Sequence, residues 1–538
     1  MKKVFFILFI VHSSLQIAEA QQPTEEWVRT YNSIDGMFDH FIDMVTDRFG
    51  NIYVTGWNGT QSQGNNMITL KYNGNGVLQW SVEYNRSGIS NDLSNGMAVD
   101  STGNCYVVGY SGFNFGPYDG VLIKYNQSGD TLWTRKLVTS LDDDFSSVVV
   151  DLNNSVYVSG RSGDSAIVFK YDSMGIMQWR ARDFQSQYLT LGGKLLLDRF
   201  NNLYIGSTKH IFNNPFSADF LVRKYTSNGT LIWATPYNGP SNVADWMTGF
   251  VIDNSGNSYS TGYTDINGRD ILTVKLNSSG IVQWAKFYNG ITNASDQGNG
   301  IICDTAGVNI FVTGYEFKTG VSRDYLTIKY NANGDTIWTR RYNGQGNYQD
   351  NAMGIALDKQ LNVYVTGEST NINQDFDVAT IKYSPDGNLQ WIANWNSPGT
   401  GGDGGNKIIV DNQFNLYVGG GAAAPGPNYL DLLTIKYSQP VGITTINNEI
   451  PKSYNLSQNY PNPFNPTTNI KYQIKNSGNV KLSVFDISGR EVATLVNEKQ
   501  ISGTYEVTFD AQNFASGIYL YELSTDEYTV TRKMVLIK

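Results

Sequence analysis

Short apolar runs follow one another in a fixed order along most of the chain, and residues 351–391 hold the clearest copy. This stretch contains the runs GIALD, NVYVTG, DVATIKY and LQW. They are rich in Val, Ile, Tyr, Thr or Trp and are bounded by Gly, Asn, Asp or Pro, which is typical of β-strands joined by tight turns. The pattern therefore predicts a unit of four short strands.

Relatives of this unit recur eight times, and tryptophan marks each copy. The successive tryptophan spacings are 53, 53, 46, 54, 51, 54 and 53 residues, for Trp27, Trp80, Trp133, Trp179, Trp233, Trp284, Trp338 and Trp391. A period of about fifty residues is in the range of propeller blades.

An aspartate closes the first run of every unit and precedes a turn such as RFGN or STGN. These residues are Asp47, Asp100, Asp151, Asp198, Asp253, Asp304, Asp358 and Asp411. A residue that every unit repeats is better explained by the fold than by catalysis. We interpret these carboxylates as turn formers that accept a backbone N–H, and we extend this to the aspartates that open the third run.

The ends of the repeat region predict how the sheets close. The chain begins with a tryptophan run at residues 27–32 that lacks three preceding strands, and the region ends after LLTIKY without a tryptophan run. The first run can therefore complete the last unit, which removes exposed sheet edges. The sequence predicts an all-β, eight-bladed β-propeller of four-stranded blades at residues 27–438, with a seven-bladed ring as the alternative.

Composition and the N-terminus place the chain in an exported class. Residues 1–20 combine Lys2 and Lys3, an apolar run and an Ala-Glu-Ala end, which predicts a signal peptide cleaved between Ala20 and Gln21. Removing Lys2, Lys3 and Glu19 takes the net charge from −9 to −10, and so acidic a chain is not expected to bind nucleic acid. We expect no transmembrane segment in the mature chain.

The only two cysteines, Cys105 and Cys303, lie four units apart. We expect two small buried apolar side chains rather than a disulfide, although an exported protein could form one.

The composition changes after the repeats. A polar linker at 439–453 leads to NYPNPFNPTT, and then to VFDISGREV, SGIYLYEL and the closing TRKMVLIK. The prolines favour an extended segment, and the later runs predict a small Ig-like β-sandwich at 454–538. These motifs resemble the type A C-terminal sorting domain of the type IX secretion system of Bacteroidetes-related bacteria. The resemblance implies contact with the secretion machinery through residues 454–538, and a secreted or outer-membrane surface location.

The repeats resemble the bacterial SBBP β-propeller repeat family, whose pattern DxxGNxYVTG is matched by DRFGNIYVTG at residues 47–56. The family name implies seven blades, and it implies no agreed activity.

Catalytic motifs are weakly represented. The histidines are His12, His40 and His210, and the motifs GxSxG and HExxH are absent, so serine-type hydrolysis and zinc chemistry have little support. We predict no catalytic residues, no metal ligands and no cofactor. Calcium at residues 141–144 is the one candidate we considered, and a plain solvated turn explains that segment better.

Function in a propeller is expected in the loops where the units differ. The candidate ligand-binding residues on this variable loop face are Phe113, Tyr118, Asp245, Trp246, Asp296, Asp350 and Asp403. Aromatic and amide-rich loops suit glycan or extended peptide recognition.

We therefore expect an exported, monomeric protein that binds a glycan or a protein without catalysis. Two alternatives stay open. One is a secreted carbohydrate-active hydrolase or lyase that uses carboxylates on the same face, and the other is a structural surface component.

Overall fold

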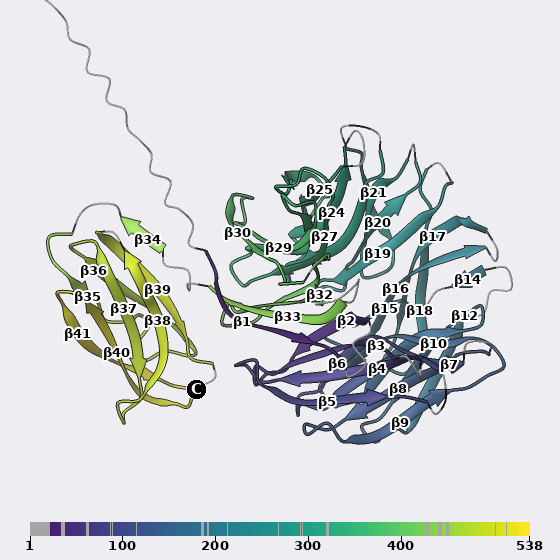
Figure 1. Ribbon diagram of the computed structural model, residues 1–538, viewed down its shortest axis with the longest axis horizontal. Coiled ribbons are helices and arrows are strands. Elements are labelled where there is room, and N and C mark those ends of the chain that lie inside the picture. The colour runs from purple at the N-terminus through teal and green to yellow at the C-terminus, as the bar shows by residue number, and fades with distance from the viewer. Residues whose placement is uncertain are drawn as a thin grey trace, which may run out of the picture.

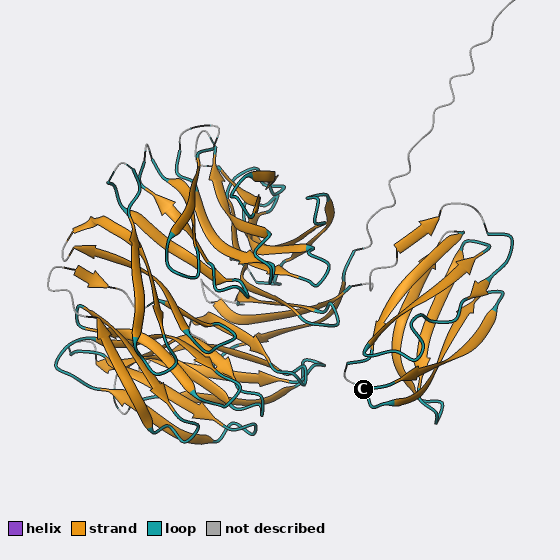
Figure 2. Cartoon of the chain, turned by 180° about the vertical axis from the view of Figure 1, so that it is seen from behind, coloured by secondary structure: helices purple, strands orange, loops and turns teal. Residues whose placement is uncertain are grey.

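The computed structural model describes residues 22–33, 38–60, 64–86, 88, 90–113, 116–183, 188–190, 193–211, 214–240, 242–266, 268–290, 292, 294–318, 322–399, 401–424, 430–439, 444–447, 451–500, 502–512 and 514–538. The predicted signal peptide and its cleavage site, Ala20 and Gln21, lie outside these ranges. The described residues form strands and turns and contain no helix (Figures 1 and 2).

The strands of the repeat region fall into units of four, which we number along the chain by their first strands. The first strands are β2 (Asp39–Thr46), β6 (Ser90–Val99), β10 (Asp143–Val150), β15 (Lys194–Leu197), β19 (Asp245–Ile252), β23 (Gln297–Cys303), β27 (Asp350–Leu357) and β31 (Gly404–Val410). The second strands are β3 (Ile52–Thr60), β7 (Cys105–Phe113), β11 (Val156–Ser162), β16 (Leu203–Ile211), β20 (Ser258–Thr264), β24 (Asn309–Phe317), β28 (Val363–Thr370) and β32 (Leu416–Ala423).

The third strands are β4 (Gly64–Tyr72), β8 (Asp119–Tyr125), β12 (Ser165–Tyr171), β17 (Asn214–Tyr225), β21 (Asp270–Leu276), β25 (Arg323–Asn331), β29 (Phe376–Tyr383) and β33 (Leu430–Ser438). The fourth strands are β5 (Leu78–Tyr84), β9 (Thr131–Leu137), β13 (Met177–Asp183), β18 (Leu231–Tyr237), β22 (Val282–Tyr288), β26 (Thr336–Tyr342), β30 (Leu389–Trp395) and β1 (Thr24–Tyr31). A short additional strand, β14 (Tyr188–Thr190), pairs with β16.

The pairing follows the repeat. Strands within a unit are antiparallel and consecutive, and β4 of the first unit also makes a short parallel pairing with β6 of the second. The N-terminal strand β1 pairs with β33, so that Trp27 lies opposite Lys436. This is the closure that the ends of the repeat region predict. Each first strand contacts the first strands of both neighbouring units, and β31 contacts β2, so the units surround a common axis (Figure 1).

The core lies between units rather than within them. One apolar cluster joins Tyr106, Val108 and Leu122 of the second unit to Phe145 and Phe169 of the third, and similar clusters occupy other junctions. A four-stranded sheet exposes two apolar faces, so each unit depends on its neighbours to bury them.

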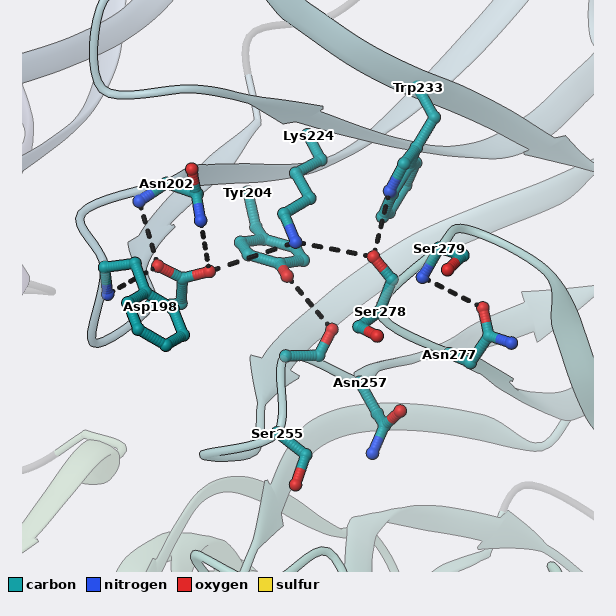
Figure 3. Close-up of polar contacts among 12 residues, drawn as sticks. Asp198, Asn202, Tyr204, Lys224, Trp233, Ser255, Asn257, Asn277, Ser278 and Ser279 are labelled. Atoms are coloured by element: carbon teal, nitrogen blue, oxygen red, sulfur yellow. Dashed lines mark hydrogen bonds and ion pairs between the residues drawn. The ribbon is translucent and has the colours of Figure 1, made fainter.

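The repeated aspartate organises the turn between the first and second strands. Asp198 accepts the backbone N–H groups of Phe200 and Asn202, both at 2.9 Å, and the Asn202 side-chain amide at 2.9 Å (Figure 3). Tyr204 lies beside this turn and donates its hydroxyl to the backbone oxygen of Gly256 in the next unit at 3.1 Å. The strand that follows the turn is thus also linked to the next unit.

A second repeated contact clamps neighbouring units together. The Trp233 indole donates to the backbone oxygen of Ser278 at 3.2 Å, and Lys224 Nζ donates to the same oxygen at 3.4 Å (Figure 3). The Lys224 ammonium also lies 4.8 Å from the centre of the Tyr204 ring. The other acceptor oxygens of this clamp belong to Gly74, Gln127, Ser173, Ser227, Ala332 and Pro385.

The clamp has a different acceptor where the chain leaves the ring. The eighth unit takes its fourth strand from the N-terminus, and the Gln439 side chain lies at the clamp position. Its Oε1 accepts Lys382 Nζ at 2.9 Å and the Tyr364 hydroxyl at 3.1 Å, while its Nε2 donates to Phe414 O at 2.9 Å. The first residue of the predicted linker therefore takes part in the ring.

The C-terminal residues form two packed four-stranded sheets (Figure 1). One contains β34 (Thr444–Asn447), β39 (Gly503–Asp510), β36 (Thr467–Ile474) and β35 (Asn455–Leu456), and the other contains β38 (Glu491–Gln500), β37 (Gly478–Phe485), β40 (Gly517–Thr525) and β41 (Thr529–Leu536). Their shared core includes Phe464, from the proline-rich segment.

Both cysteines are free: Cys105 is buried and Cys303 is half-buried.

Replacing Gln439 by Ala tests the closing contact. Lys382 loses its acceptor in a buried junction, and an unsatisfied buried donor costs about 1–3 kcal/mol. We expect the free energy of unfolding to fall by about that amount in denaturant titrations. Gln127→Ala is the matched control, because the clamp there uses the backbone oxygen of residue 127. Equal losses in the two variants would contradict this role.

Candidate functional site

A glycine in the second strand shapes the inner edge of seven units. A Cβ on Gly367 would lie 2.0 Å from the backbone oxygen of Asn351, and one on Gly262 would lie 1.8 Å from that of Trp246. The first strand approaches so closely because it is bulged at this point in each of the seven units. The glycine of the YVxG run is therefore required by a contact, and the bulge turns one side chain away from the ladder.

The bulged residues link neighbouring first strands. They are Ile42, Asn95, Ser146, Thr248, Asn299, Met353 and Asn406. Asn95 Nδ2 donates to Phe145 O of the next unit at 2.9 Å, and Asn299 Nδ2 donates to Ala352 O at 2.8 Å. Asn95, Thr248 and Asn406 are also exposed, so this edge presents polar groups to solvent as well.

The cross-strand pair beside each glycine differs from unit to unit. These pairs are His40–Trp57, Leu93–Tyr110, Asp144–Arg161, Trp246–Tyr263, Gln297–Tyr315, Asn351–Glu368 and Gly404–Gly421. We call them the mouth pairs. His40 and Trp57 stack with ring centres 5.1 Å apart, whereas Arg161 Nε lies 3.0 Å from the Asp144 carboxylate. The chemistry of the mouth thus changes around the ring.

A cavity lies at the end of the ring that carries the mouth pairs, which we call the mouth, between the seventh, eighth and first units. The cavity has a volume of about 270 Å³. Its lining residues are Asp39, His40, Phe41, Asn351, Met353, Glu368, Phe376, Asn406, Gly421 and Leu430, together with residues 402–405, which include Asp403. Glycine at both positions of the eighth mouth pair contributes to this space, because a Cβ on Gly404 would lie 3.7 Å from the Glu368 side chain.

Glu368 is the polar centre of the cavity wall. Its Oε1 accepts Asn351 Nδ2 at 3.4 Å, and the side chain is half-buried. Burial raises the pKa of Glu368, while the bond from Asn351 and the charge of Arg323 act in the opposite direction. The cavity therefore offers a carboxylate, carboxamides, an imidazole and an aromatic ring.

The four predicted aspartates occupy a repeated position at or just before the start of a first strand. Asp403 accepts the backbone N–H groups of Ser397 at 2.6 Å and Ala423 at 2.7 Å, and Asp350 accepts those of Gly344 and Thr370 at 2.7 and 3.0 Å. Asp245 and Asp296 have the same location. All four are at most 1% exposed, so each carboxylate fixes the connection between two units. Their predicted ligand-binding role stays a prediction.

The predicted aromatic residues lie in separate units. Phe113 is 44% exposed and stacks beneath Arg86, whose Cζ is 4.8 Å from the ring centre. Tyr118 packs against Tyr110 at 4.9 Å, and Trp246 lies 5.7 Å from His210. The seven predicted residues thus spread around the ring, and Asp403 is the only one that lines the cavity.

Residues 141–144 have protein partners. Asp143 accepts the backbone N–H of Thr139 at 2.8 Å, and Asp144 pairs with Arg161. Within the described ranges there is no group of three or more His, Cys, Asp or Glu side chains arranged to hold a metal.

Sequence reasoning missed Glu368, Asn351, His40 and Phe376. A signal was present, because the glycine of the YVxG run is constant in these units while the residue after it is Trp57, Tyr110, Arg161, Tyr263, Tyr315, Glu368 or Gly421. The variation directly after this constant glycine identifies the mouth pairs better than loop composition does.

Comparison with known families assigns two parts of the chain. Residues 458–538 match the secretion system C-terminal sorting domain, and residues 337–373 match the beta-propeller repeat. The chain thus contains a type IX sorting domain and, ahead of it, a match to the β-propeller repeat family. That domain directs export to the cell surface or the extracellular space and implies contact with the secretion machinery. No described residue belongs to a helix long and apolar enough to cross a bilayer.

A curated relative is the uncharacterized WD repeat-containing protein L264 of Acanthamoeba polyphaga mimivirus. It is 23% identical, and the match covers 56% of this chain and 26% of the relative. The chain thus spans about a quarter of that protein's length.

Solved structures with a partly similar backbone include a fungal AA5-family alcohol oxidase in complex with copper. It has 11% identity and a TM-score of 0.39, and the match covers 97% of this chain and 100% of that chain. A Lactobacillus plantarum protein has 13% identity, a TM-score of 0.40, and coverage of 64% and 95%. A PL25 ulvan lyase has 10% identity, a TM-score of 0.38, and coverage of 68% and 95%. Likenesses at this level do not bear on the function of the β-propeller repeat protein.

The buried aspartates of this protein make its stability depend on pH. Burial raises the pKa of Asp296 to about 6, and the charges of Glu316 and Asp270 add to this, while the bonds from Phe317 and Gly290 oppose it. In the unfolded chain an aspartate titrates near pH 3.9. Between about pH 4 and 6 the folded state therefore holds more protons, and the free energy of unfolding falls as the pH rises.

Asp296→Asn tests this linkage. The variant has no carboxyl to titrate, so its deficit relative to the parent protein is largest at pH 4 and shrinks by up to about 3 kcal/mol by pH 7. Urea unfolding from pH 4 to 8 measures the difference. A deficit that is constant or that grows with pH would contradict the raised pKa.

Proposed function

We propose that the exported protein is a non-enzymatic binding protein that holds a carbohydrate in the cavity between the seventh, eighth and first units. The observation that carries this proposal is the hollow at the mouth, lined by Glu368, Asn351, Asn406, His40 and Phe376. It is the place where the variable mouth pairs leave room for a ligand.

The chemistry of the lining suits sugar hydroxyl groups. A carboxylate and two carboxamides accept and donate hydrogen bonds in the directions that vicinal hydroxyls need. The Phe376 ring and the Met353 side chain, which is 37% exposed, supply the apolar surface that covers a sugar face. The volume of about 270 Å³ lies near the lower end of the range of roughly 300–1,000 Å³ found for small-molecule sites, so we expect the cavity to hold a small saccharide unit.

The carboxylates of the cavity favour binding over hydrolysis. Glycoside hydrolysis needs two carboxyl groups that both face the substrate. Here Glu368 is the acid that is particular to its unit. Asp403 and Asp39 also line the cavity, but both occupy the position at the start of a first strand that most units repeat, where Asp403 accepts the backbone N–H groups of Ser397 and Ala423 and Asp39 accepts that of Ser33. Glu368 is thus the one cavity acid outside this repeated structural position, which suits recognition better than acid–base catalysis.

Glu368→Gln and Phe376→Ala test the site. A glycan array with the full-length protein would first identify a ligand class, and calorimetry would then give dissociation constants. We expect Glu368→Gln to weaken binding at least tenfold, because a charge-assisted hydrogen bond contributes about 1.5–3 kcal/mol. We expect Phe376→Ala to weaken it about fivefold or more through the lost apolar contact.

Tyr263→Phe is the control, since Tyr263 has the equivalent mouth position in the fifth unit, away from the cavity. Its affinity should stay within about twofold of the parent value. Loss of binding in this control but not in Glu368→Gln would place the ligand elsewhere. Release of shortened or unsaturated products from the bound glycan would favour the hydrolase or lyase alternative.

A further inference from the structure

A row of buried polar side chains crosses the first unit next to its junction with the eighth. Asp39 lies opposite Asn58, and Asn58 lies opposite Asn66, on the neighbouring strands β2, β3 and β4. Directly opposed residues of adjacent strands project to the same face of the sheet, with Cβ atoms about 5 Å apart. The three side chains are 0%, 1% and 1% exposed, so they form a continuous buried polar row, one end of which, Asp39, adjoins the cavity at the mouth.

Oxygen atoms along this row have no hydrogen-bond partner. They are Asp39 Oδ1, Asn58 Oδ1 and Asn66 Oδ1, and the Asn66 amide nitrogen and the Ser33 hydroxyl also lack a partner. Ser33 adjoins the row, because its backbone N–H donates to Asp39 Oδ2 at 2.8 Å. A buried polar atom without a partner costs about 1–3 kcal/mol, so several in one place indicate a missing partner.

The seventh and eighth units show how the same position can be satisfied, whereas Oδ1 of Asp92 and of Asp245 lacks a partner as Asp39 Oδ1 does. Asp403 Oδ1 accepts the backbone N–H of Ala423, and Asp350 Oδ1 accepts that of Thr370. In the first unit the equivalent group, the N–H of Gly59, donates to Phe38 O at 2.7 Å instead. The local backbone geometry therefore leaves Asp39 Oδ1 without a backbone donor.

The orientation of Asn58 leaves its carbonyl oxygen on the row. Its Nδ2 donates to Glu83 Oε1 at 2.8 Å, and this bond fixes which end of the amide is the acceptor. The row thus offers oxygen acceptors and no cationic group of its own.

A second carboxylate adds negative charge to the same junction. Asp431 of the eighth unit is 6% exposed, and its Oδ1 has no partner. Burial contributes most to the raised pKa of Asp39, the backbone and side chain of Ser33 oppose the shift, and the charges of Asp431 and Glu83 add to it. Two equivalent aspartates of other units have cations, since Asp119 pairs with Arg86 at 2.6 Å and Asp219 with Lys209 at 3.6 Å, whereas Asp270 has an Oδ1 without a partner, as Asp431 does. Among the described residues, none of the ion pairs reaches Asp39 or Asp431.

We propose that the polar row is a cation site that takes Ca²⁺. Asp39 Oδ1, Asn58 Oδ1 and Asn66 Oδ1 supply carboxylate and amide oxygens, the Ser33 hydroxyl adjoins them, and Asp431 balances the charge of the ion. Calcium prefers six to eight hard oxygen ligands in an adaptable geometry, and water completes the shell. The bound ion links the β1–β2 connection, through Ser33, to three strands of the first unit, and so stabilises the N-terminal strand that closes the ring.

Calcium titration of the chelator-treated full-length protein tests the proposal without any carbohydrate, so the result does not depend on the proposed function. We expect calorimetric binding of one Ca²⁺ at this site and an unfolding midpoint that rises with Ca²⁺ concentration. Asp39→Asn should weaken Ca²⁺ binding at least tenfold and abolish most of the midpoint shift.

Asp350→Asn is the matched control. It removes the same charge at the same repeated position, outside the cavity lining, where both oxygens already have backbone partners, and its Ca²⁺ affinity should stay within about twofold of the parent value. Asn58→Asp provides a gain-of-affinity test that does not depend on the fold tolerating Asp39→Asn. A third carboxylate should lower the midpoint of the metal-free protein and tighten Ca²⁺ binding at least tenfold.

Three outcomes would overturn the site. The first is a midpoint and a calorimetric trace that do not respond to Ca²⁺, as expected if ordered water alone occupies the row. The second is an equal effect of Asp39→Asn and Asp350→Asn on Ca²⁺ affinity. The third is an unchanged affinity in Asn58→Asp.

Discussion

The ring depends on one backbone carbonyl in each turn between a third and a fourth strand. That oxygen accepts both a tryptophan indole and a lysine ammonium from the preceding unit. The lysines need such an acceptor, because burial lowers the pKa of Lys124, Lys275 and Lys329. Two donors that converge on one carbonyl fix the distance and the angle between units, and the apolar clusters fill the space that this geometry leaves. No unit is complete alone, so the arrangement is stable only when the last clamp is closed as well.

Closure uses what the two ends of the chain supply. The phase of the repeats predicts that the Trp27 strand completes the last sheet, and β1 pairs with β33 accordingly. The sequence could not predict Gln439, since a side-chain carbonyl replaces a backbone carbonyl there only because the chain leaves the ring at that residue. The clamp shows that the ring extends into the segment that composition assigns to the linker, directly before the sorting domain.

The repeated residues were easier to interpret than the site. Turn-forming aspartates, tryptophans and lysines recur at fixed spacing, so a local rule explains each of them. The aspartates at the start of the first strands, such as Asp350 and Asp403, were read as candidate ligand groups because they adjoin variable loops. Their burial depends on backbone N–H groups far away in sequence, from Thr370 and Ala423. Glu368 lies in a strand and not in a loop, and only the bulge opposite Gly367 places it at the mouth.

The clamp and the mouth lie at opposite ends of the same strands. A second strand such as β28 (Val363–Thr370) begins beside the Asp358 turn and carries Glu368 near its other end. Five residues separate Val363 from Glu368, which is about 16 Å at 3.3 Å per residue. A substitution in a mouth pair is therefore far from the clamp, and the glycine and the bulge are the only constant features beside it. The ring can thus present a different pair in every unit while each junction keeps the same contacts. Within one repeat, the residues that stabilise the junction are therefore separate from those that could recognise a ligand. The first unit is an exception, because its polar row lies at the mouth end of the strands and also contributes to the junction with the eighth unit.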